Sequence, residues 1–446
     1  MKIYIETLGC PKNVVDSEEI SGRLIKDDNE IVKVPDEADI ILVNTCGFIN
    51  DAKQESIDRV LELAEYKKSR CKTLIVTGCL SERYGEELFA EMPEADVIMG
   101  VNDYENISDI IKKTQVKDSQ RALYLSPSSE KYVEMGDRVL STAKQTAYVK
   151  ISEGCDNYCS YCSIPYIRGP YRSRPFESII NEAQKLSAEG CAEIILVAQD
   201  VTNYGIDLYG KYRIHELANE LSQIEGIKWI RLMYCYPQLI TDELIQVMAQ
   251  KENICKYIDL PIQHCSNHIL EAMNRRVTKD EIINVINKLR SQIPDISIRT
   301  TLIVGLPGET EEDFEELKFF VEEMEFDRLG VFEYSPEEGT PAAEMENQID
   351  DIVKKERKDI LMKLQQEIAL KKNRAQIGKV LTVLTEEKTD DENVYIGRTQ
   401  YDAPEIDNSV LFTSASALKK GTFVKVKITD AMEYDLIGED INESAK

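Results

Sequence analysis

Three cysteines stand close together in the middle of the chain, with the spacing CxxxCxxC: Cys155, Cys159 and Cys162. Three thiolates on one short loop can each hold one iron of a 4Fe-4S cluster. Because no nearby fourth cysteine completes the set, the last iron would stay open to a small molecule. The alternative is structural zinc, but zinc prefers four protein ligands, and none of the three histidines lies in the motif. The spacing therefore favours a cluster with one open iron.

Three further cysteines each follow a predicted strand in the first part of the chain: Cys10, Cys46 and Cys79. In a doubly wound sheet, the loops after the strands gather along one carboxyl edge, where ligands bind. A glycine next to each cysteine lets the backbone bend tightly. The alternative is three ordinary buried cysteines, since cysteine is common in cores. The shared position favours a second cluster, again with three protein ligands and one open iron.

The composition sets limits on the compartment and the partners. The chain has 446 residues, with 54 Lys and Arg against 81 Asp and Glu, for a net charge of −27. Such a surface repels nucleic-acid phosphates and attracts basic partners. The spacing of the cysteines suits metal ligands in a reducing compartment, and no apolar run approaches the roughly 18–20 residues that span a bilayer. We expect a cytoplasmic protein that is not bound to membranes.

The elements that position these cysteines alternate strands with helices. In residues 1–116 this rhythm predicts an α/β, doubly wound domain, followed by a polar linker over residues 117–144. The predicted strands are Lys2–Leu8, Asp39–Asn44, Thr73–Thr77 and Asp96–Met99, and the predicted helices lie near Asp16–Lys26, Asp51–Lys67 and Glu82–Met92.

Residues 145–375 repeat the rhythm six times, which predicts an open (β/α)6 barrel, part of the TIM-barrel plan, with a connecting helix over Ile349–Ala375. Its strands are placed at Ala147–Ser152, Glu193–Ala198, Trp229–Cys235, Tyr257–Leu260, Ser297–Val304 and Leu329–Tyr334. Residues 376–446 change to short strands and turns, which predicts a small antiparallel β-barrel of the OB-like kind. Its strands are placed at Val380–Thr385, Val394–Arg398, Ser409–Phe412 and Thr422–Thr429.

With these motifs in this order, nearly the whole chain resembles the methylthiotransferase family of radical S-adenosylmethionine (SAM) enzymes, whose final barrel is called TRAM. The resemblance implies two 4Fe-4S clusters and SAM as cofactors. One cluster, on Cys155, Cys159 and Cys162, would bind SAM and cleave it to a 5′-deoxyadenosyl radical that removes hydrogen from carbon. The other, on Cys10, Cys46 and Cys79, would present sulfur, and a second SAM would donate the methyl group.

Five further residues are candidates for binding SAM. Tyr161 lies between two cluster ligands, where radical SAM enzymes commonly place an aromatic side chain against the adenine. Gln199, Gln263 and Arg299 lie at or near predicted strands of the barrel, and Gly305 allows close backbone approach at a strand-to-helix turn. Each of the last four could equally be an ordinary structural residue.

Two branches of the family compete: one modifies adenosine in transfer RNA, and the other, the RimO type, modifies the β-carbon of an aspartate of ribosomal protein S-twelve. Residues 10–13 read CPKN, where the tRNA enzymes usually carry Gln-Met-Asn after the cysteine. Residues 261–264 read PIQH, and residues 337–338 are both Glu, where the tRNA type usually has Arg-Pro. These patterns favour the protein-modifying branch, with the tRNA enzyme as the alternative.

The charge of the last domain points the same way. Residues 376–446 hold 8 Lys and Arg against 14 Asp and Glu, whereas an RNA-binding barrel should be basic. We therefore expect a basic protein partner, with direct nucleic-acid binding unfavourable, and carboxylates such as Glu386 and Glu387 steering that partner to the cavity mouth. The implied reaction also needs an electron donor and a sulfur source, which the sequence does not identify.

Overall fold

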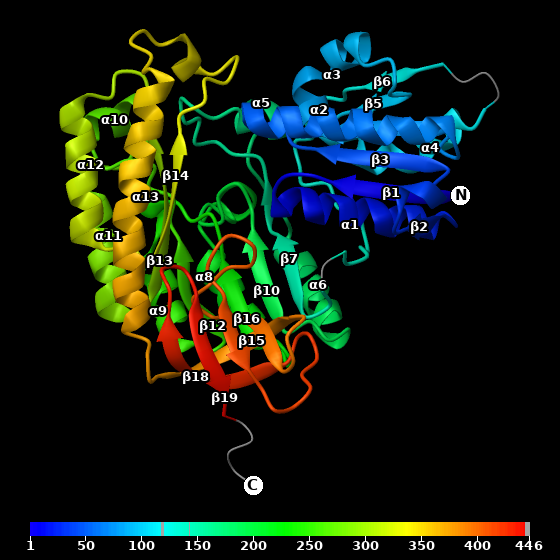
Figure 1. Ribbon diagram of the computed structural model, residues 1–446. Helices are drawn as coiled ribbons and strands as arrows, with labels where there is room; N and C mark the ends of the chain where they lie inside the picture. Colours follow the sequence, from blue (N-terminus) through cyan, green and yellow to red (C-terminus); the bar gives the residue numbers. More distant parts are fainter. Residues whose placement is uncertain (117–119, 142, 442–446) are drawn as a thin grey trace.

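A six-stranded, wholly parallel sheet forms the first domain of the computed structural model, which describes residues 1–116, 120–141 and 143–441. Its strand order is β2-β1-β3-β4-β5-β6 (Figure 1). The strands are β1 (Lys2–Thr7), β2 (Glu30–Val32), β3 (Ile40–Thr45), β4 (Thr73–Gly78), β5 (Val97–Met99) and β6 (Ala122–Tyr124). The helices are α1 (Pro11–Lys26), α2 (Asn50–Ala64), α3 (Cys79–Glu91) and α4 (Ile107–Thr114).

Helices cover both faces of this sheet, so the predicted doubly wound arrangement is confirmed. Ile41 and Val43 of β3 pack in one core with α2 and α3. Ile40 and Leu42 of the same strand pack in the other core with α1 and α4. Because successive side chains of a strand point to opposite faces, the continuous apolar run of β3 serves both cores.

Three details of this domain differ from the prediction. Helix α1 begins at Pro11, directly after Cys10, because proline is well tolerated at the first helical position. The three-residue strand β2 is too short to give an alternating pattern. The strand β6 lies inside the segment predicted as a linker, where it pairs with β5 and extends the sheet. Residues 117–119 and 142 of that segment, and residues 442–446 of the last domain, lie outside the described residues.

The middle domain is an open sheet of six parallel strands in the order β14-β13-β12-β11-β10-β7, as predicted. The strands are β7 (Thr146–Lys150), β10 (Glu193–Val197), β11 (Trp229–Leu232), β12 (Ile254–Asp259), β13 (Ser297–Val304) and β14 (Arg328–Glu333), and a short antiparallel pair joins β8 (Ser152–Glu153) to β9 (Arg172–Ser173). The helices are α5 (Ile164–Arg168), α6 (Phe176–Ala188), α7 (Ile206–Tyr209), α8 (Ile214–Leu221), α9 (Asp242–Gln250), α10 (Asn267–Ala272), α11 (Lys279–Gln292) and α12 (Glu311–Met324).

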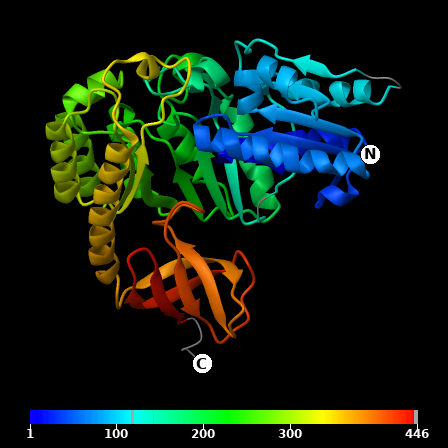
Figure 2. The same cartoon turned by 45° about the horizontal axis from the view of Figure 1, so that its top comes forward.

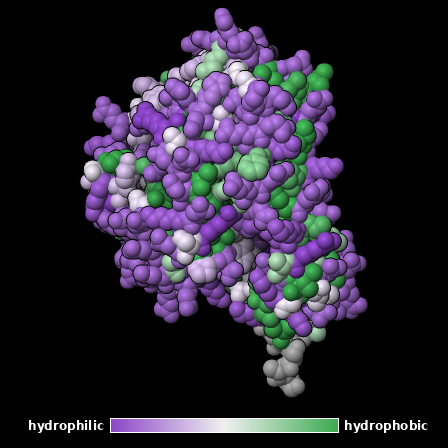
Figure 3. Space-filling model, turned by 90° about the vertical axis from the view of Figure 1, so that its left-hand side faces the viewer, coloured by the Kyte–Doolittle hydropathy of each residue, from purple (hydrophilic) through white to green (hydrophobic). Residues whose placement is uncertain are grey.

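The long helix α13 (Asp351–Arg374) packs along α12 and β14 and leads to the last domain (Figure 1). The outer face formed by these helices is mostly hydrophilic, with hydrophobic side chains scattered in small groups (Figure 3). Scattered exposed apolar residues of this kind are normal for a protein surface. No helix in the described ranges combines the length and the apolar character needed to cross a membrane.

The last domain is a closed five-stranded barrel in the order β15-β16-β17-β19-β18. Its strands are β15 (Val380–Lys388), β16 (Val394–Thr399), β17 (Val410–Thr413), β18 (Phe423–Ala431) and β19 (Leu436–Asp440). Four neighbouring pairs are antiparallel, as predicted, whereas β17 and β19 run parallel. The strand β19, which the sequence analysis did not find, is the one that closes the barrel.

This barrel lies against the amino ends of the strands of the middle domain (Figure 2). Arg398 of β16 forms a buried ion pair with Glu193, the first residue of β10, and Arg231 contacts the same carboxylate at 3.2 Å. Arg328, the first residue of β14, pairs with Asp402 at 2.6 Å.

The placement corrects the steering role that was expected of Glu386. Glu386 accepts a hydrogen bond from Arg398 at this interface, whereas the loops that carry the cysteines lie at the carboxyl end of the strands (Figure 1). Its carboxylate therefore helps to dock the barrel and does not border the expected cavity mouth.

Candidate iron–sulfur active site

Cys10, Cys46 and Cys79, here called the strand-end set, follow three strands that are neighbours in the sheet. The strands β1, β3 and β4 lie side by side in that order, so their carboxyl ends bring the three loops together. A Cβ built on Gly9 would lie 2.7 Å from the Cβ of Cys46, and one built on Gly47 would lie 2.9 Å from the carbonyl carbon of Cys79. The loops therefore pack so closely that only glycine fits at these two positions.

Asn13 ties the loops of the strand-end set together. Its amide nitrogen donates to the carbonyl of Leu8 at 2.8 Å and to that of Thr45 at 3.1 Å. Its amide oxygen lies 3.9 Å from the sulfur of Cys79. The CPKN pattern therefore includes a residue that shapes the cysteine site itself.

Two thiols of the strand-end set, those of Cys46 and Cys79, are desolvated by burial. Burial raises the pKa of Cys79 to about 12, although the Arg168 guanidinium acts to lower it. Burial also raises the pKa of Cys46. Without iron the two thiols thus hold their protons at neutral pH, and iron binding must displace those protons because metals take the thiolate.

Cys155, Cys159 and Cys162, here called the CxxxCxxC set, lie on the loop between β8 and α5. The amide of Cys155 donates to the carbonyl of Gly169 at 3.2 Å, and that of Cys162 donates to the carbonyl of Cys159 at 3.0 Å. Between them, the Ser160 hydroxyl donates to the carbonyl of Ala272 at 2.7 Å. The bond to Ala272 fixes the loop to α10 of the middle domain, whereas the other two bonds hold the shape of the loop itself.

In this set, burial raises the pKa of Cys155 to about 12. For Cys162 the shift is upward as well, with burial as the largest cause and the neighbouring Cys159 as the next. Within the described residues, no three His, Cys, Asp or Glu side chains meet around a single-ion position. A 4Fe-4S cluster differs from a single ion because each cysteine holds its own iron.

Two of the predicted SAM contacts present unused polar atoms. The amide nitrogen of Gln199 donates to Glu153 at 2.7 Å, but its amide oxygen is buried without a partner among the described residues. The amide oxygen of Gln263 is in the same condition. Buried polar atoms normally find a partner, so these two acceptors fit a ligand that brings donors, as the amino group and the ribose hydroxyls of SAM do.

Tyr161 is packed rather than free. Its ring lies against the apolar cluster that includes Met273, Leu306 and Tyr334. Its hydroxyl accepts a hydrogen bond from Arg275 at 3.4 Å. Its place beside the cluster ligands is as the sequence predicts, and its ring is held in a fixed position.

The structure gives Arg299 and Gly305 other contacts. Arg299 pairs with Asp259 at 2.9 Å and with Asp407 of the last domain at 3.3 Å, so its charge serves the interface at the amino ends of the strands. The amide of Gly305 donates to Glu309 at 2.6 Å, and a Cβ there would lie 2.3 Å from Cγ of Lys354. Gly305 is therefore needed for the close approach of α13.

Arg168 connects the two cysteine sets, and sequence reasoning did not assign it this role. Its Nε and Nη2 donate to the sulfur of Cys79 at 3.3 and 3.2 Å. Its Nη1 pairs with Asp16 at 2.8 Å and with Glu153 at 3.4 Å. Glu153 stands two residues before Cys155. The sequence signal at this position is a short basic run formed by Arg168, Arg172 and Arg174. Spacing in the sequence cannot reveal a partner 89 residues away.

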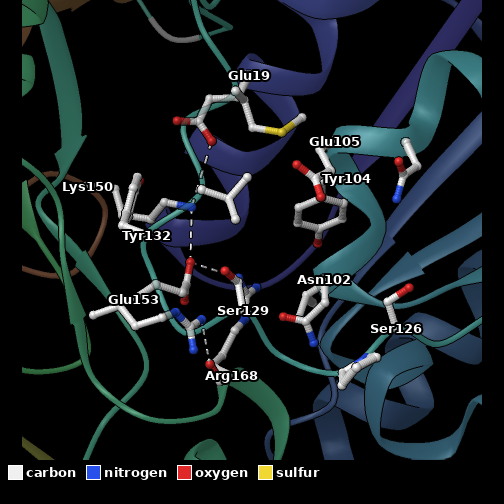
Figure 4. Close-up of a pocket in the computed structure, with 16 residues that line it drawn as sticks. Glu19, Asn102, Tyr104, Glu105, Ser126, Ser129, Tyr132, Lys150, Glu153 and Arg168 are labelled. Atoms are coloured by element: carbon white, nitrogen blue, oxygen red, sulfur yellow. Dashed lines mark hydrogen bonds and ion pairs between the residues drawn. The ribbon is translucent and has the colours of Figure 1, made fainter.

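Glu153 is the centre of a charged cluster at this joint. Lys150 pairs with it at 3.1 Å. Burial would raise the pKa of Glu153, but Lys150 and Arg168 outweigh burial and hold that pKa well below its usual range. The cluster borders a cavity of about 140 Å³ between the first two domains (Figure 4). Ion pairs therefore fasten the CxxxCxxC loop to the first domain.

Lys12, the third residue of the CPKN pattern, docks the first domain on the middle domain. Its ammonium group lies 3.9 Å from the centre of the Tyr234 ring and donates to the carbonyl of Ala198 at 3.4 Å. Both partners follow strands of the middle domain, β11 and β10. The strand-end set is thereby held over the carboxyl end of the open barrel.

Glu337 forms a second contact between the same domains, an ion-pair cluster with Lys53 and Arg83 that is here called the Glu337 clasp. This carboxylate, only 2% exposed, pairs with Lys53 of α2 at 2.9 Å and with Arg83 of α3 at 2.8 Å. Arg83 also donates to the carbonyl of Gly47 at 3.2 Å and to that of Glu338 at 2.6 Å. The acidic pattern at 337–338 therefore serves domain docking.

Glu337→Gln should lower the free energy of unfolding by about 3 kcal/mol, because it leaves two cations without their buried partner. Burial would raise the pKa of Glu337, but Lys53 and Arg83 outweigh it and lower that pKa below 4.5. The stabilisation is thus present above pH 4.5, and the difference between the proteins shrinks as the pH falls through the lowered value.

Urea unfolding at pH 7 and at lower pH measures both effects. Glu338→Gln is the matched control, since only the backbone carbonyl of Glu338 takes part in the clasp. Equal stability of the two variants at pH 7 would refute the clasp.

Comparison with known proteins agrees with this architecture. Residues 2–100 match the model of "Uncharacterized protein family UPF0004", residues 149–321 match that of the radical SAM superfamily, and residues 377–441 match that of the TRAM domain. Among solved structures, the radical SAM methyltransferase TsrM from Kitasatospora setae has a TM-score of 0.56 at 12% identity, and covers 76% of each chain. The cobalamin-dependent SAM radical enzyme OxsB has a TM-score of 0.51 at 14% identity, over 82% of this chain and 56% of that one. These structures support the fold alone.

Curated relatives are similar over the whole length. The protein from Acetivibrio thermocellus named "Ribosomal protein uS12 methylthiotransferase RimO" is 52% identical, over 100% of this chain and 99% of its own. Proteins with the same name from Desulforamulus reducens and Clostridioides difficile are 54% and 53% identical, over 98% and 100% of this chain and 99% and 100% of their own. With all three domains matched and both cysteine sets in place, the chain belongs to the RimO family of radical SAM methylthiotransferases.

Proposed function

We propose that this protein installs a methylthio group on the β-carbon of an aspartate of ribosomal protein uS12. The observation that carries the proposal is the run of contacts from Cys79 through Arg168 to Glu153, which stands two residues before Cys155. These contacts lie at the interface of the two domains that carry the three-cysteine sets. A reaction that needs a carbon radical and a sulfur donor requires both centres close to one substrate.

The residues of each set would hold one 4Fe-4S cluster. When bound, the cluster on the CxxxCxxC set supplies the electron that cleaves SAM, and the cluster on the strand-end set presents the sulfur. The protein's own part is positioning. Gln199 and Gln263 offer buried amide oxygens to the amino group or the ribose hydroxyls of SAM, and Tyr161 offers a fixed ring beside the cluster loop. Arg299 and Gly305 are left out of this proposal because the structure uses them elsewhere.

The reaction also needs partners that are not part of this chain. A one-electron reductant must supply the electron for SAM cleavage, and a sulfur donor must replace each sulfur that leaves with the product. We also propose that the reaction takes place in the cytoplasm, where ribosomal proteins are found and thiols stay reduced.

The alternative substrate within the family is transfer RNA. The acidic last barrel disfavours it, because phosphate neutralisation dominates RNA affinity. In that barrel, Arg398 is buried in an ion pair with Glu193, so its positive charge is not available at the surface. The balance of charge therefore supports a protein substrate.

The substrate is tested by incubating the reconstituted enzyme, SAM, sulfide and a reductant with either purified uS12 or unmodified transfer RNA. We expect a methylthio mass gain on one aspartate of uS12, located by peptide fragmentation, and none on the RNA. A reaction without SAM is the control. A gain on adenosine with none on uS12 would overturn the proposal.

A further inference from the structure

Arg168 reaches from the middle domain into the strand-end set. It is the last residue of α5 and is only 2% exposed. Two of its N–H groups point at one sulfur, that of Cys79, at 3.3 and 3.2 Å. A third contact, from Nη2 to the amide oxygen of Asn13 at 2.8 Å, joins it to the residue that shapes the same loops.

The guanidinium is held in place by two carboxylates from different domains. Asp16 of α1, fully buried, accepts from Nη1 at 2.8 Å, and Glu153 of the middle domain lies 3.4 Å from the same nitrogen. Asp16 also pairs with Lys150. The planar fork of an arginine is suited to such a fixed, several-partner geometry, so its direction toward Cys79 is set by the charges around it.

A donor of this kind matters for an iron–sulfur cluster. Hydrogen bonds to the sulfurs, net charge and solvent exposure set the reduction potential of a cluster. A buried positive charge with two N–H groups on a ligand sulfur stabilises the reduced state, which is more negative, over the oxidised state. Burial strengthens this effect, because Cys79 is only 6% exposed and Arg168 only 2%.

We propose that Arg168 is a positioning residue that donates two hydrogen bonds to the Cys79 thiolate of the loaded strand-end cluster and raises the reduction potential of that cluster. This inference rests on the proposed function, since it requires a cluster in the strand-end set. Through its ion pair with Glu153, Arg168 also holds the strand-end cluster in a defined position relative to the CxxxCxxC loop. Arg168 thus belongs to one domain and tunes the cluster of the other.

The test uses the full chain with Cys155, Cys159 and Cys162 changed to Ala, so that only the strand-end cluster is present. Arg168→Gln removes the charge and the paired donors, whereas Arg168→Lys keeps the charge. Redox titration followed by electron paramagnetic resonance measures the reduction potential of each protein. We expect the highest potential for the variant that keeps Arg168, a lower one for Arg168→Lys and the lowest for Arg168→Gln. For Arg168→Gln we expect the ratio of reduced to oxidised cluster at a given solution potential to be at least tenfold lower. This corresponds to a decrease of about 59 mV in the one-electron reduction potential.

Arg174→Gln is the matched control. Arg174 is a second buried arginine of the same run, but it pairs with Glu182 and bonds Ser178, not a cysteine. Its substitution should leave the potential unchanged. An unchanged potential in Arg168→Gln with four irons bound would overturn the inference while leaving the proposed function intact.

A second measurement needs no change at Arg168. In the same background, incorporation of ¹⁵N-arginine should give a nitrogen hyperfine coupling to the reduced cluster in pulsed resonance spectra. A cluster that forms but shows no such coupling would refute the contact, even where the Arg168 variants fail to fold. Absence of iron from this background would instead overturn the proposed function, and with it this inference.

Discussion

The anaerobically reconstituted chain should bind about eight irons, and the variant with Cys155, Cys159 and Cys162 all changed to Ala should bind about four. The reason is that the two sets are built on different scaffolds. The strand-end set depends on the carboxyl edge of the first sheet, whereas the CxxxCxxC set depends on a loop that is bonded to the middle domain. Iron analysis together with optical spectra measures the result.

A matched control uses cysteines outside both sets. Cys71 of the first domain and Cys265 of the middle domain are buried in apolar cores, so Cys71→Ala and Cys265→Ala should each retain the full iron content. Loss of all iron from the triple variant would show that the two sites do not form independently. A wild-type chain without iron would contradict the cluster interpretation altogether.

Cys46→Ala should separate the two halves of the reaction. We expect the variant to cleave SAM to 5′-deoxyadenosine when reduced, because the CxxxCxxC set is untouched. Methylthio transfer should fall by more than about 100-fold, since even residues that only support a metal ligand cost 10–100-fold. Chromatography of the nucleoside and mass spectrometry of uS12 measure the two activities on one sample.

Cys159→Ala is the complementary variant and should lose SAM cleavage and methylthio transfer together. Cys10→Ala and Cys79→Ala should behave like Cys46→Ala. Normal amounts of methylthiolated product from Cys46→Ala would remove the sulfur-presenting role from the first domain. Loss of SAM cleavage in the same variant would mean that the domains cooperate in that step as well.

The family-specific patterns have a structural meaning that differs from direct substrate contact. Lys12 lies against Tyr234 and Ala198, Glu337 clasps Lys53 and Arg83, and Asn13 joins two loops of the strand-end set. These side chains set how the first domain sits over the open barrel.

The sequence by itself determined the domain order, the two parallel sheets and the two cysteine sets. Continuous apolar runs such as β3 predict strands buried on both faces, and cysteines placed directly after such strands must meet at one edge of the sheet. These inferences depend on local patterns and on the general rules of α/β topology. Short elements escaped them: β2 and β6 have three residues each, too few to show a period.

Only the tertiary structure decided which charges meet across domains. Arg168 contacts Cys79, Asp16 and Glu153 because three segments distant in the chain converge at one joint. The same cause turns Arg299 toward Asp407 and places the acidic last barrel at the amino ends of the strands. The periodicity of a sequence does not indicate which partner a charged side chain will meet. That pairing is decided when whole domains dock against one another.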